Sequence, residues 1–421
     1  MIVLDKEKHV FTLHTQNTTY QMKADENRVL LHTYYGPRVE GGDLSYLIQY
    51  ADRGFCHNPS QVGQRRDYSL DTLPQEYSTC GVGDFRLSSA QVEQPDGSRL
   101  LDLRYVSHEV RPGKYALEGL PAFHGEGGET LSVLLRDPSS SVEAELLYGV
   151  FEEYDLITRA VRIRNRGERP VRLAQAASLC LDLPRAGLDF ITFDGGHARE
   201  RGMHRAALRP GVQSVGSTRG TSSHQHNPFV MLCGRDAGED HGLCYGAALL
   251  YSGGFLAEAE LSQFGDIRLV LGLQPQGFFW LLGPGEAFTT PEAAMICSPN
   301  GFTPMTHRFH RAIRERLLRS PRGGLQRPVL INNWEATYFD FTAEKLLEIA
   351  EASAPLGIQL LVMDDGWFGR RNDDFGGLGD WNVNRGKLPG GLEALVPRVR
   401  GLGMRFGLWV EPEMVSEDSA L

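Results

Sequence analysis

Short runs of alternating polar and apolar residues dominate the chain up to about residue 300. Clear examples lie at 9–14, 131–135, 142–148, 156–164 and 267–273, with glycine, proline, asparagine and aspartate between them. This pattern is typical of half-buried antiparallel strands joined by turns, and long helical stripes are few. We therefore predict a large antiparallel β-sandwich domain over residues 1–300.

A helical pattern follows this region. Phe309, Ile313 and Leu317 are spaced four residues apart, which places them on one face of a helix over residues 303–319. The segment Ser-Pro-Arg-Gly-Gly at 320–324 ends the helix. We expect residues 301–326 to form a helical connector between two domains.

From residue 327 onward, apolar strands alternate with helices. The strands are predicted at 328–334, 359–365 and 405–411, and the helices at 341–356, with Thr342 as N-cap, and at 391–402, broken or kinked near Pro397. This order is typical of parallel βα units. A complete (β/α)8 TIM barrel needs about 250 residues. Residues 327–421 suffice for about three units, so we expect either an incomplete barrel or a smaller α/β sheet.

Polar and aromatic side chains gather where each of these strands ends. Trp334 follows the first strand, Asp364 and Asp365 end the second, and Trp409 and Glu411 lie near the end of the third. In barrels of parallel strands, the active site is formed at the carboxyl ends of the strands. These residues are therefore the first candidates for a functional site.

Composition narrows the classes of partner. The formal net charge of −10 argues against nucleic acid or an anionic membrane as the main partner and suits a neutral small molecule. No run of 18 apolar residues predicts a membrane span, and the first residues do not have the pattern of a signal peptide. The six cysteines form no CxxC motif, so we expect reduced thiols in a cytoplasmic protein and no metal site.

An ordered set of motifs carries a family resemblance over essentially the whole chain. The motifs lie at 73–77, 83–86, 219–228, 251–255, 332–340, 364–368, 378–381 and 407–415. Together they resemble the bacterial α-galactosidases of glycoside hydrolase family 36. The resemblance implies a β-supersandwich followed by a catalytic barrel, a homotetramer, and no metal or organic cofactor. It also implies retaining hydrolysis of terminal α-galactosides such as melibiose and raffinose-type oligosaccharides.

Asp364 and Asp365 are predicted to bind the sugar. Adjacent carboxylates on a strand point to opposite faces, so they are poor candidates for the facing nucleophile and acid of a retaining glycosidase. A carboxylate can instead accept hydrogen bonds from two sugar hydroxyls, and the resemblance implies this role. The structural alternative is a turn or helix cap after the strand. Trp334 and Trp409 are predicted to serve as platforms, on whose aromatic rings the C–H face of the sugar packs. The alternative is that both are buried in the core.

The residues that perform the chemistry in the family are not found in these 421 residues. The resemblance places the nucleophile in a Lys-Trp-Asp motif, which this sequence lacks, and the acid/base aspartate later still. We therefore expect both catalytic aspartates beyond Leu421 and no hydrolysis by this chain alone. Glu411 is expected to be a structural or supporting carboxylate rather than the catalytic acid.

Two further sugar-binding candidates lie in the first 300 residues. Asp52 resembles the residue that reaches the sugar of a neighbouring subunit, and its alternative is a surface salt bridge with Arg53 or Arg65. His197 stands where family members usually have tryptophan, and it offers hydrogen bonds but less stacking area.

Other functions remain open from the sequence. One is a non-catalytic sugar-binding or oligomerisation module built on the sandwich. Another is a related enzyme, either a raffinose-synthase-like transglycosidase or an α-N-acetylgalactosaminidase. The residues that would separate these enzymes are expected beyond Leu421.

Overall fold

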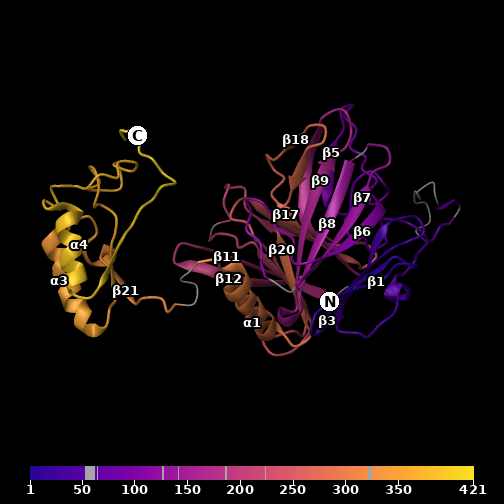
Figure 1. The fold of residues 1–421 in the computed structure, drawn as a ribbon, viewed down its shortest axis with the longest axis horizontal. Coiled ribbons are helices and arrows are strands. Elements are labelled where there is room, and N and C mark those ends of the chain that lie inside the picture. Colours follow the sequence, from indigo (N-terminus) through magenta and orange to yellow (C-terminus); the bar gives the residue numbers. More distant parts are fainter. Residues whose placement is uncertain are drawn as a thin grey trace. The chain divides into compact units, whose positions relative to one another are not determined.

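The computed structural model describes residues 1–52, 62–63, 65–125, 128–140, 142–184, 187–222, 224–320 and 325–421. The chain divides into two compact units, Met1–Gly323 and Gly324–Leu421 (Figure 1). Each unit has its own hydrophobic core among the described residues.

Three antiparallel sheets build the first unit. The first is a meander of β1 (Ile2–Asp5), β2 (Val10–His14), β3 (Thr18–Ala24) and β4 (Leu30–Pro37). The second has the order β13 (Gly211–Gly216), β16 (Phe255–Leu261), β17 (Ile267–Leu273), β10 (Val171–Leu183) and β18 (Trp280–Leu282), with β5 (Ala90–Glu93) on β10. The third has the order β12 (Arg199–Ala207), β11 (Leu188–Gly196), β14 (Phe229–Gly234), β15 (Cys244–Leu249), β20 (Ala293–Ser298), β9 (Leu156–Asn165), β8 (Val142–Phe151), β7 (Glu129–Arg136) and β6 (Arg104–Pro112), with β19 (Ala287–Thr289) on β9.

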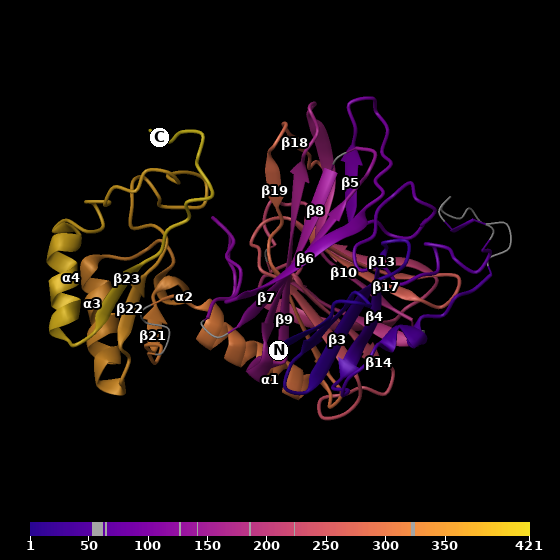
Figure 2. The same ribbon diagram turned by 45° about the vertical axis from the view of Figure 1, so that its right-hand side comes forward.

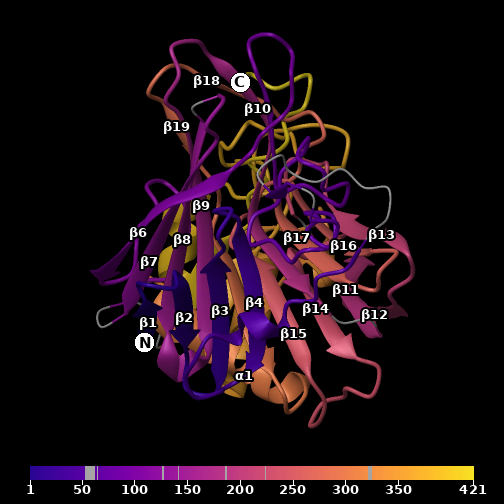
Figure 3. The same ribbon diagram turned by 90° about the vertical axis from the view of Figure 1, so that its right-hand side faces the viewer.

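At its strand β20 the third sheet is buried on both faces. Met295 and Cys297 of β20 belong to the main core, which the sheet shares with the meander β1–β4 (Figure 3). Their neighbours Ala294 and Ile296 point the other way, into a second apolar cluster with α1 (Phe302–Ala312). This alternation follows from the two-residue period of a strand. Short helical turns among the described residues of the first unit include η1 (Leu44–Leu47), η3 (Glu152–Tyr154) and η4 (Ile313–Leu317).

Helix α1 is part of the first unit rather than a free-standing linker. Met305 and Phe309 are buried against the third sheet, and Ile313 and Leu317 pack partly against the same cluster. The helical face predicted from the four-residue spacing is confirmed. The expected connector 301–326 is therefore divided, because its helix packs on the first unit and the division between the units lies after residue 323.

The second unit contains three parallel strands and their helices. The strands are β21 (Leu330–Asn332), β22 (Leu360–Met363) and β23 (Arg405–Leu408), in that order in the sheet. The helices are α2 (Trp334–Thr337), α3 (Ala343–Ser353), η5 (Ala354–Leu356) and α4 (Gly391–Gly401). Helices α3 and α4 lie side by side along the sheet (Figure 2). The Thr342 hydroxyl accepts the N–H of Lys345 and so confirms the predicted N-cap.

Two details of the second unit differ from the sequence prediction. The strands are shorter than predicted, since β21 ends at Asn332 and β23 at Leu408, so Trp334 and Trp409 lie beyond their strands. Helix α4 continues through Pro397 as one helix, so the predicted break there is wrong, and the alternative of a kink stays a prediction. Pro397 is exposed, so water can bind the carbonyl that its missing N–H leaves free.

Two general features of the described residues concern membranes and thiols. None of the described helices has the length and hydrophobicity needed to cross a lipid bilayer. The described cysteines are free thiols, namely Cys80, Cys180, Cys233, Cys244 and Cys297, and Cys56 lies outside the described residues.

Candidate functional site

The carboxyl ends of the three parallel strands meet at one edge of the sheet. Asn332 is the last residue of β21, Asp364 follows β22, and Trp409 follows β23. The strand register pairs Asn332 with Val362 and Met363 with Leu408, so the residues that follow share this edge. The fold therefore brings together four of the predicted sugar-binding positions, Trp334, Asp364, Asp365 and Trp409, at the ends of the strands.

Two asparagines hold Asp364 in place across the pair β21–β22. Asn332 Nδ2 donates to Asp364 Oδ2, and Asn333 Oδ1 accepts the backbone N–H of Asp364 at 2.8 Å. Asp364 Oδ1 accepts the N–H of Asp365 at 2.7 Å. A carboxylate offers about four acceptor positions. The contacts among the described residues thus leave about two positions on Asp364 for a ligand.

Arg371 binds the carboxylate of Asp365. Its Nε donates to Oδ1 and to Oδ2 at 3.0 Å each, and its Nη2 donates to Oδ2 at 2.8 Å. Oδ1 also accepts the N–H of Gly366 at 2.6 Å. Both side chains are buried, with 5% of Arg371 and 8% of Asp365 exposed. The hydrogen-bonded Asp365 raises the pKa of the Arg371 guanidinium above its usual range.

Lys387 stabilises the turn that carries both carboxylates. Its Nζ donates to the carbonyl oxygens of Gly366 at 2.9 Å and of Arg371 at 3.2 Å. Burial lowers the pKa of Lys387, while the charges of Asp365 and Asp340 act in the opposite direction. Gly366 has a φ of +92°, the left-handed conformation that glycine adopts without steric cost.

The two predicted platform residues are both partly buried. Trp334 begins α2 and makes an edge-to-face contact with Phe339, with ring centroids 5.0 Å apart. Trp409 lies nearly parallel to Phe368 at 6.4 Å and packs against the core of the second unit. The backbone oxygen of Trp409 accepts the indole N–H of Trp367 at 2.9 Å. Trp409 therefore packs on the core, whereas Trp334 makes ring contacts with Tyr338 and Phe339, and both tryptophans are partly exposed.

Two family models match consecutive parts of the chain. Residues 28–283 match the glycosyl hydrolase family 36 N-terminal domain, and residues 287–421 match the model described as melibiase. The first match alone spans more than half of the chain. The chain belongs to glycosyl hydrolase family 36.

Family 36 relatives align with almost the entire chain. The bifunctional alpha-galactosidase/sucrose kinase AgaSK of Mediterraneibacter gnavus is 47% identical over all of this chain and 45% of its own length. Alpha-galactosidase AgaA of Geobacillus stearothermophilus is 45% identical over 98% of this chain and 56% of its own length. The chain therefore spans about half the length of the curated relatives it matches.

Solved structures from family 36 share the fold. The galactosidase domain of AgaSK superposes with a TM-score of 0.96 at 47% identity, over all of this chain and 59% of that chain. A variant of AgaA in complex with raffinose superposes with a TM-score of 0.94 at 45% identity, over 98% of this chain and 57% of that chain. These similarities confirm the predicted fold class, a large antiparallel β domain followed by parallel βα units.

Glu411 lies three residues beyond the end of β23 in this family 36 chain. Its side chain is partly exposed. Its charge is close enough to contribute to the raised pKa of Arg371, after the larger contributions of Asp365 and Asp374. The role of Glu411 as a supporting carboxylate stays a prediction.

Asp52 belongs to the first unit, whereas the strand-end residues belong to the second. It pairs with Arg66, with Arg66 Nε and Asp52 Oδ2 3.3 Å apart. Arg65, one of the two alternative partners, pairs with Asp67 and with Glu26, each at 3.1 Å. Arg53, the other alternative, lies outside the described residues. The sugar-binding role of Asp52 stays a prediction.

His197 lies at the tip of the hairpin that joins β11 to β12. Its neighbour Ala198 has a φ of +61°, and the N–H of Ala198 donates to Glu200 at 3.1 Å. Hydrogen bonds from backbone N–H groups lower the pKa of Glu200. The tight turn leaves the His197 ring exposed to solvent. Its predicted contact with sugar is not tested by this geometry.

The sequence prediction missed the two cations of the site, Arg371 and Lys387. They lie six and 22 residues after Asp365, and no periodic pattern marks either of them. The signal that could have found them is chemical, because a buried pair of adjacent carboxylates requires nearby positive charge. Within the part of the chain that the structure describes, no group of three or more metal-ligating side chains is placed to hold an ion.

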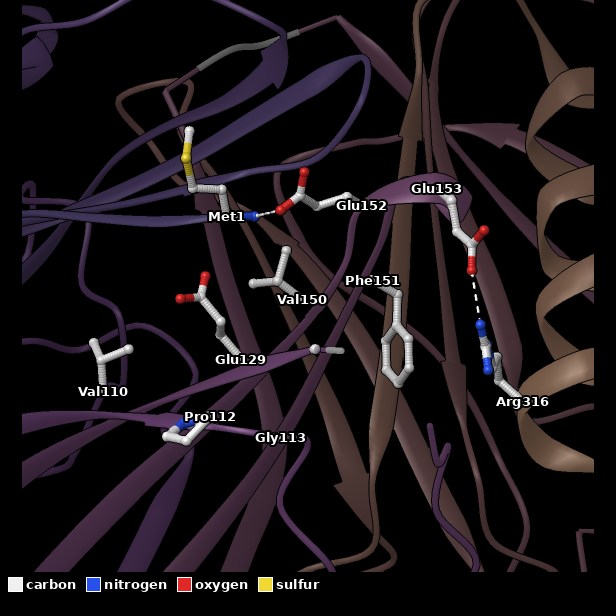
Figure 4. A pocket seen from close by; sticks show the side chains of 11 residues that line it. Met1, Val110, Pro112, Gly113, Glu129, Val150, Phe151, Glu152, Glu153 and Arg316 are labelled. Carbon is white, nitrogen blue, oxygen red and sulfur yellow. Dashed lines mark hydrogen bonds and ion pairs between the residues drawn. The ribbon is translucent and has the colours of Figure 1, made fainter. Parts of the chain in front are cut away.

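A separate cavity of about 860 Å³ lies in the first unit (Figure 4). Its charged groups are partnered, since the amino group of Met1 pairs with Glu152, and Arg316 pairs with Glu153 at 3.0 Å. Glu129 accepts the N–H of Ile2 at 2.8 Å. No predicted sugar-binding residue is found among those that line this cavity.

Proposed function

We propose that this chain supplies the sugar-binding part of an α-galactosidase active site. In the whole protein, that site removes terminal α-galactosyl residues from melibiose-type and raffinose-type oligosaccharides. The observation that carries the proposal is the Asp364–Asp365 pair, held at the carboxyl edge of the parallel sheet between Asn332 and Arg371.

The chemistry of this edge suits a neutral sugar. Galactose presents hydroxyl donors on some faces and apolar C–H groups on others. Asp364 retains about two acceptor positions for hydroxyl groups, and charge-assisted hydrogen bonds of this kind are strong and directional. Trp334 and Trp409 keep partly exposed rings on which a C–H face can pack.

The relatives support the same substrate class. AgaSK and AgaA are named alpha-galactosidases, and AgaA variants have been solved in complex with raffinose and with stachyose. These complexes concern AgaA itself. We extend the substrate class to the present protein because identity of 45% covers nearly the whole chain, including the strand-end segments.

We assign the bond-breaking carboxylates to a part of the protein outside these 421 residues. A retaining glycosidase uses two carboxyl groups about 5 Å apart on either side of the glycosidic bond. Asp364 and Asp365 are adjacent in the chain, and different partners, Asn332 and Arg371, hold their carboxylates. They therefore suit hydroxyl binding better than nucleophilic attack with acid catalysis.

The test compares this chain with a longer form that carries the rest of the barrel. We expect the longer form to hydrolyse p-nitrophenyl α-galactoside, and we expect the 421-residue chain to bind galactose without turnover. The β-galactoside and the α-N-acetylgalactosaminide serve as control substrates. A longer form that prefers either control contradicts the proposed specificity, and transfer of galactose to added sucrose indicates a transglycosidase.

We also propose a cytoplasmic homo-oligomer in which Asp52 and His197 reach the sugar of a neighbouring subunit. Mixed oligomers provide the test. Asp52→Asn and Asp364→Asn subunits each lose one part of the shared site, so mixing them restores intact sites only if Asp52 acts between subunits. Recovery of galactose binding on mixing supports the assignment, and no recovery contradicts it.

A further inference from the structure

We propose that Arg371 is a positioning residue of the sugar-binding site, which fixes the Asp365 carboxylate in a single orientation for the sugar hydroxyls. The inference rests on the proposed function of the Asp364–Asp365 pair. It adds a residue that neither the strand pattern nor the motifs identify.

The geometry of the pair is that of a bidentate contact. Nε and Nη2 of Arg371 approach both oxygens of Asp365, at distances of 2.8–3.0 Å. The planar guanidinium matches the planar carboxylate, so the contact sets the rotation of the carboxylate as well as its position. Nε has a single N–H, which both oxygens share, and Nη2 and the N–H of Gly366 supply two more. Three N–H groups therefore bind the carboxylate, and about one of its four acceptor positions remains.

Arg371 is itself held from several sides. Nη1 donates to the carbonyl oxygen of Gly376 at 3.1 Å, and the backbone oxygen of Arg371 accepts Nζ of Lys387 at 3.2 Å. The guanidinium lies 5.5 Å from the centroid of the Phe339 ring. An arginine fixed in this way transmits a fixed orientation to the carboxylate that it binds.

The other charged groups near this pair are less suited to the role. Asp374 lies 3.8 Å from Nη2 of Arg371, but 78% of its side chain is exposed. Lys387 donates to backbone oxygens, and its described hydrogen bonds include none to Asp365. The two contacts that orient the Asp365 carboxylate among the described residues are therefore Arg371 and the N–H of Gly366.

The consequence concerns how the two aspartates work together. Asp364 is oriented by Asn332, and Asp365 is oriented by Arg371, so each carboxylate has its own support. Together they present about three free acceptor positions in fixed directions, enough for at least two hydroxyl groups. Preorganisation of this kind strengthens binding because the carboxylates lose little freedom when the sugar arrives.

The experiment measures galactose affinity of the 421-residue chain by ligand-observed NMR titration, which suits millimolar dissociation constants. Arg371→Lys keeps the positive charge and removes the planar guanidinium that contacts both oxygens of Asp365. Arg370→Lys is the matched control, since Arg370 is the adjacent residue, is 71% exposed and pairs with Asp418 at 2.6 Å. We expect Arg371→Lys to weaken galactose binding at least tenfold and Arg370→Lys to change it less than twofold.

A double variant separates positioning from general structural support. If Arg371 acts through Asp365, the variant Asp365→Asn/Arg371→Lys binds galactose no more weakly than Asp365→Asn alone. The titration midpoint reports the Kd of the folded molecules, so partial unfolding does not imitate the effect. If the second unit does not fold in Arg371→Lys, Arg371→Gln is used instead. The same loss of galactose affinity and the same comparison with Asp365→Asn then apply.

Two results overturn the assignment. One is an affinity of the folded Arg371→Lys chain within twofold of the unmodified chain. The other is a loss of galactose affinity in the double variant that equals the sum of the losses, in binding free energy, of the two single variants. An unmodified chain that does not bind galactose at all instead rejects the proposed function, together with the role of Arg371 that depends on it.

Discussion

Arg159 and Glu76 form an ion pair in the interior of the first unit, with Nη1 and Oε1 3.1 Å apart and at most 1% of either side chain exposed. Tyr148 donates its hydroxyl to the same Oε1 at 2.7 Å, and a ring nitrogen of His32 lies 3.2 Å from Oε2. Burial alone would raise the pKa of Glu76. The Arg159 charge and the hydrogen bonds from His32 and Tyr20 outweigh it, and the pKa is lower than its usual value.

Removal of this carboxylate charge is expected to destabilise the first unit strongly. Glu76→Gln leaves Arg159 buried without its counter-ion, which costs about 3–5 kcal/mol. Urea unfolding followed by far-UV circular dichroism measures the change, because the first unit holds most of the β-sheet. The control is Glu40→Gln, whose residue is 87% exposed beside Arg38, with an expected change below about 0.5 kcal/mol. Equal effects of the two substitutions would contradict this prediction.

The same carboxylate predicts a dependence of stability on pH. The pKa of Glu76 in the folded state lies below its ordinary value of 4.5, so the unfolded chain takes up the proton first as the pH falls. The stabilisation by Glu76 is therefore complete above about pH 4.5 and is lost as the pH falls further, through the folded pKa. Urea titrations between pH 7 and pH 3 should show a steeper loss for the unmodified chain than for Glu76→Gln. If the stability of both proteins falls equally with pH, Glu76 is not the cause of the loss.

Gly366 is expected to tolerate no side chain. A Cβ at this position would lie 2.9 Å from Cδ1 of Phe339 and 3.1 Å from Nζ of Lys387. Gly357 is the matched control, since its φ of +86° is also left-handed and a Cβ there meets nothing within 4 Å. Both alanine substitutions incur about 1 kcal/mol of backbone strain. Gly366→Ala should cost a further 1–3 kcal/mol or so from overpacking.

Tryptophan fluorescence measures this difference, because four of the five tryptophans lie in the second unit. Urea midpoints of the two glycine variants are compared under the same conditions. An equal loss of stability for Gly357→Ala and Gly366→Ala would show that the turn at Gly366 accommodates a methyl group.

Galactose binding should depend on the Asp364 carboxylate. Asp364→Asn replaces an ionised acceptor by a neutral amide, and hydrogen bonds to a charged group contribute about 1.5–3 kcal/mol, which corresponds to a loss of about 10- to 100-fold in affinity. Asp373→Asn is the control, because Asp373 is exposed and its described hydrogen bond is to the N–H of Phe375. The measurement is the galactose titration by NMR. A similar affinity for both variants would remove Asp364 from the site.

The order of elements in the second unit could be predicted because it depends on local patterns. Apolar runs that end in polar residues predict buried parallel strands, and the Thr342 cap marks the start of a helix in the sequence itself. The positions of Asp364, Asp365, Trp334 and Trp409 near one edge then follow from parallel strands, whose carboxyl ends lie together.

The partners of these residues could not be predicted, because they depend on where loops return in space. Arg371 reaches Asp365 through a turn without a periodic pattern. Asp52 pairs with Arg66, whereas the salt-bridge alternative for Asp52 named Arg53 or Arg65. The sequence also places strand ends a few residues too far along the chain. In β23, the apolar run continues to Val410, whereas the strand ends at Leu408.

By itself, the sequence determined the two kinds of architecture, the family and the strand-end position of the sugar-binding candidates. The spacing of hydrophobic residues and the order of the motifs can be read from the sequence without knowing which residues are in contact. Only the tertiary structure decided which charges are paired, as between Glu76 and Arg159, 83 residues apart, and between Asp365 and Arg371. The physical reason is that the energy of a buried charge depends on the atoms within a few ångströms of it, and folding alone determines which atoms those are.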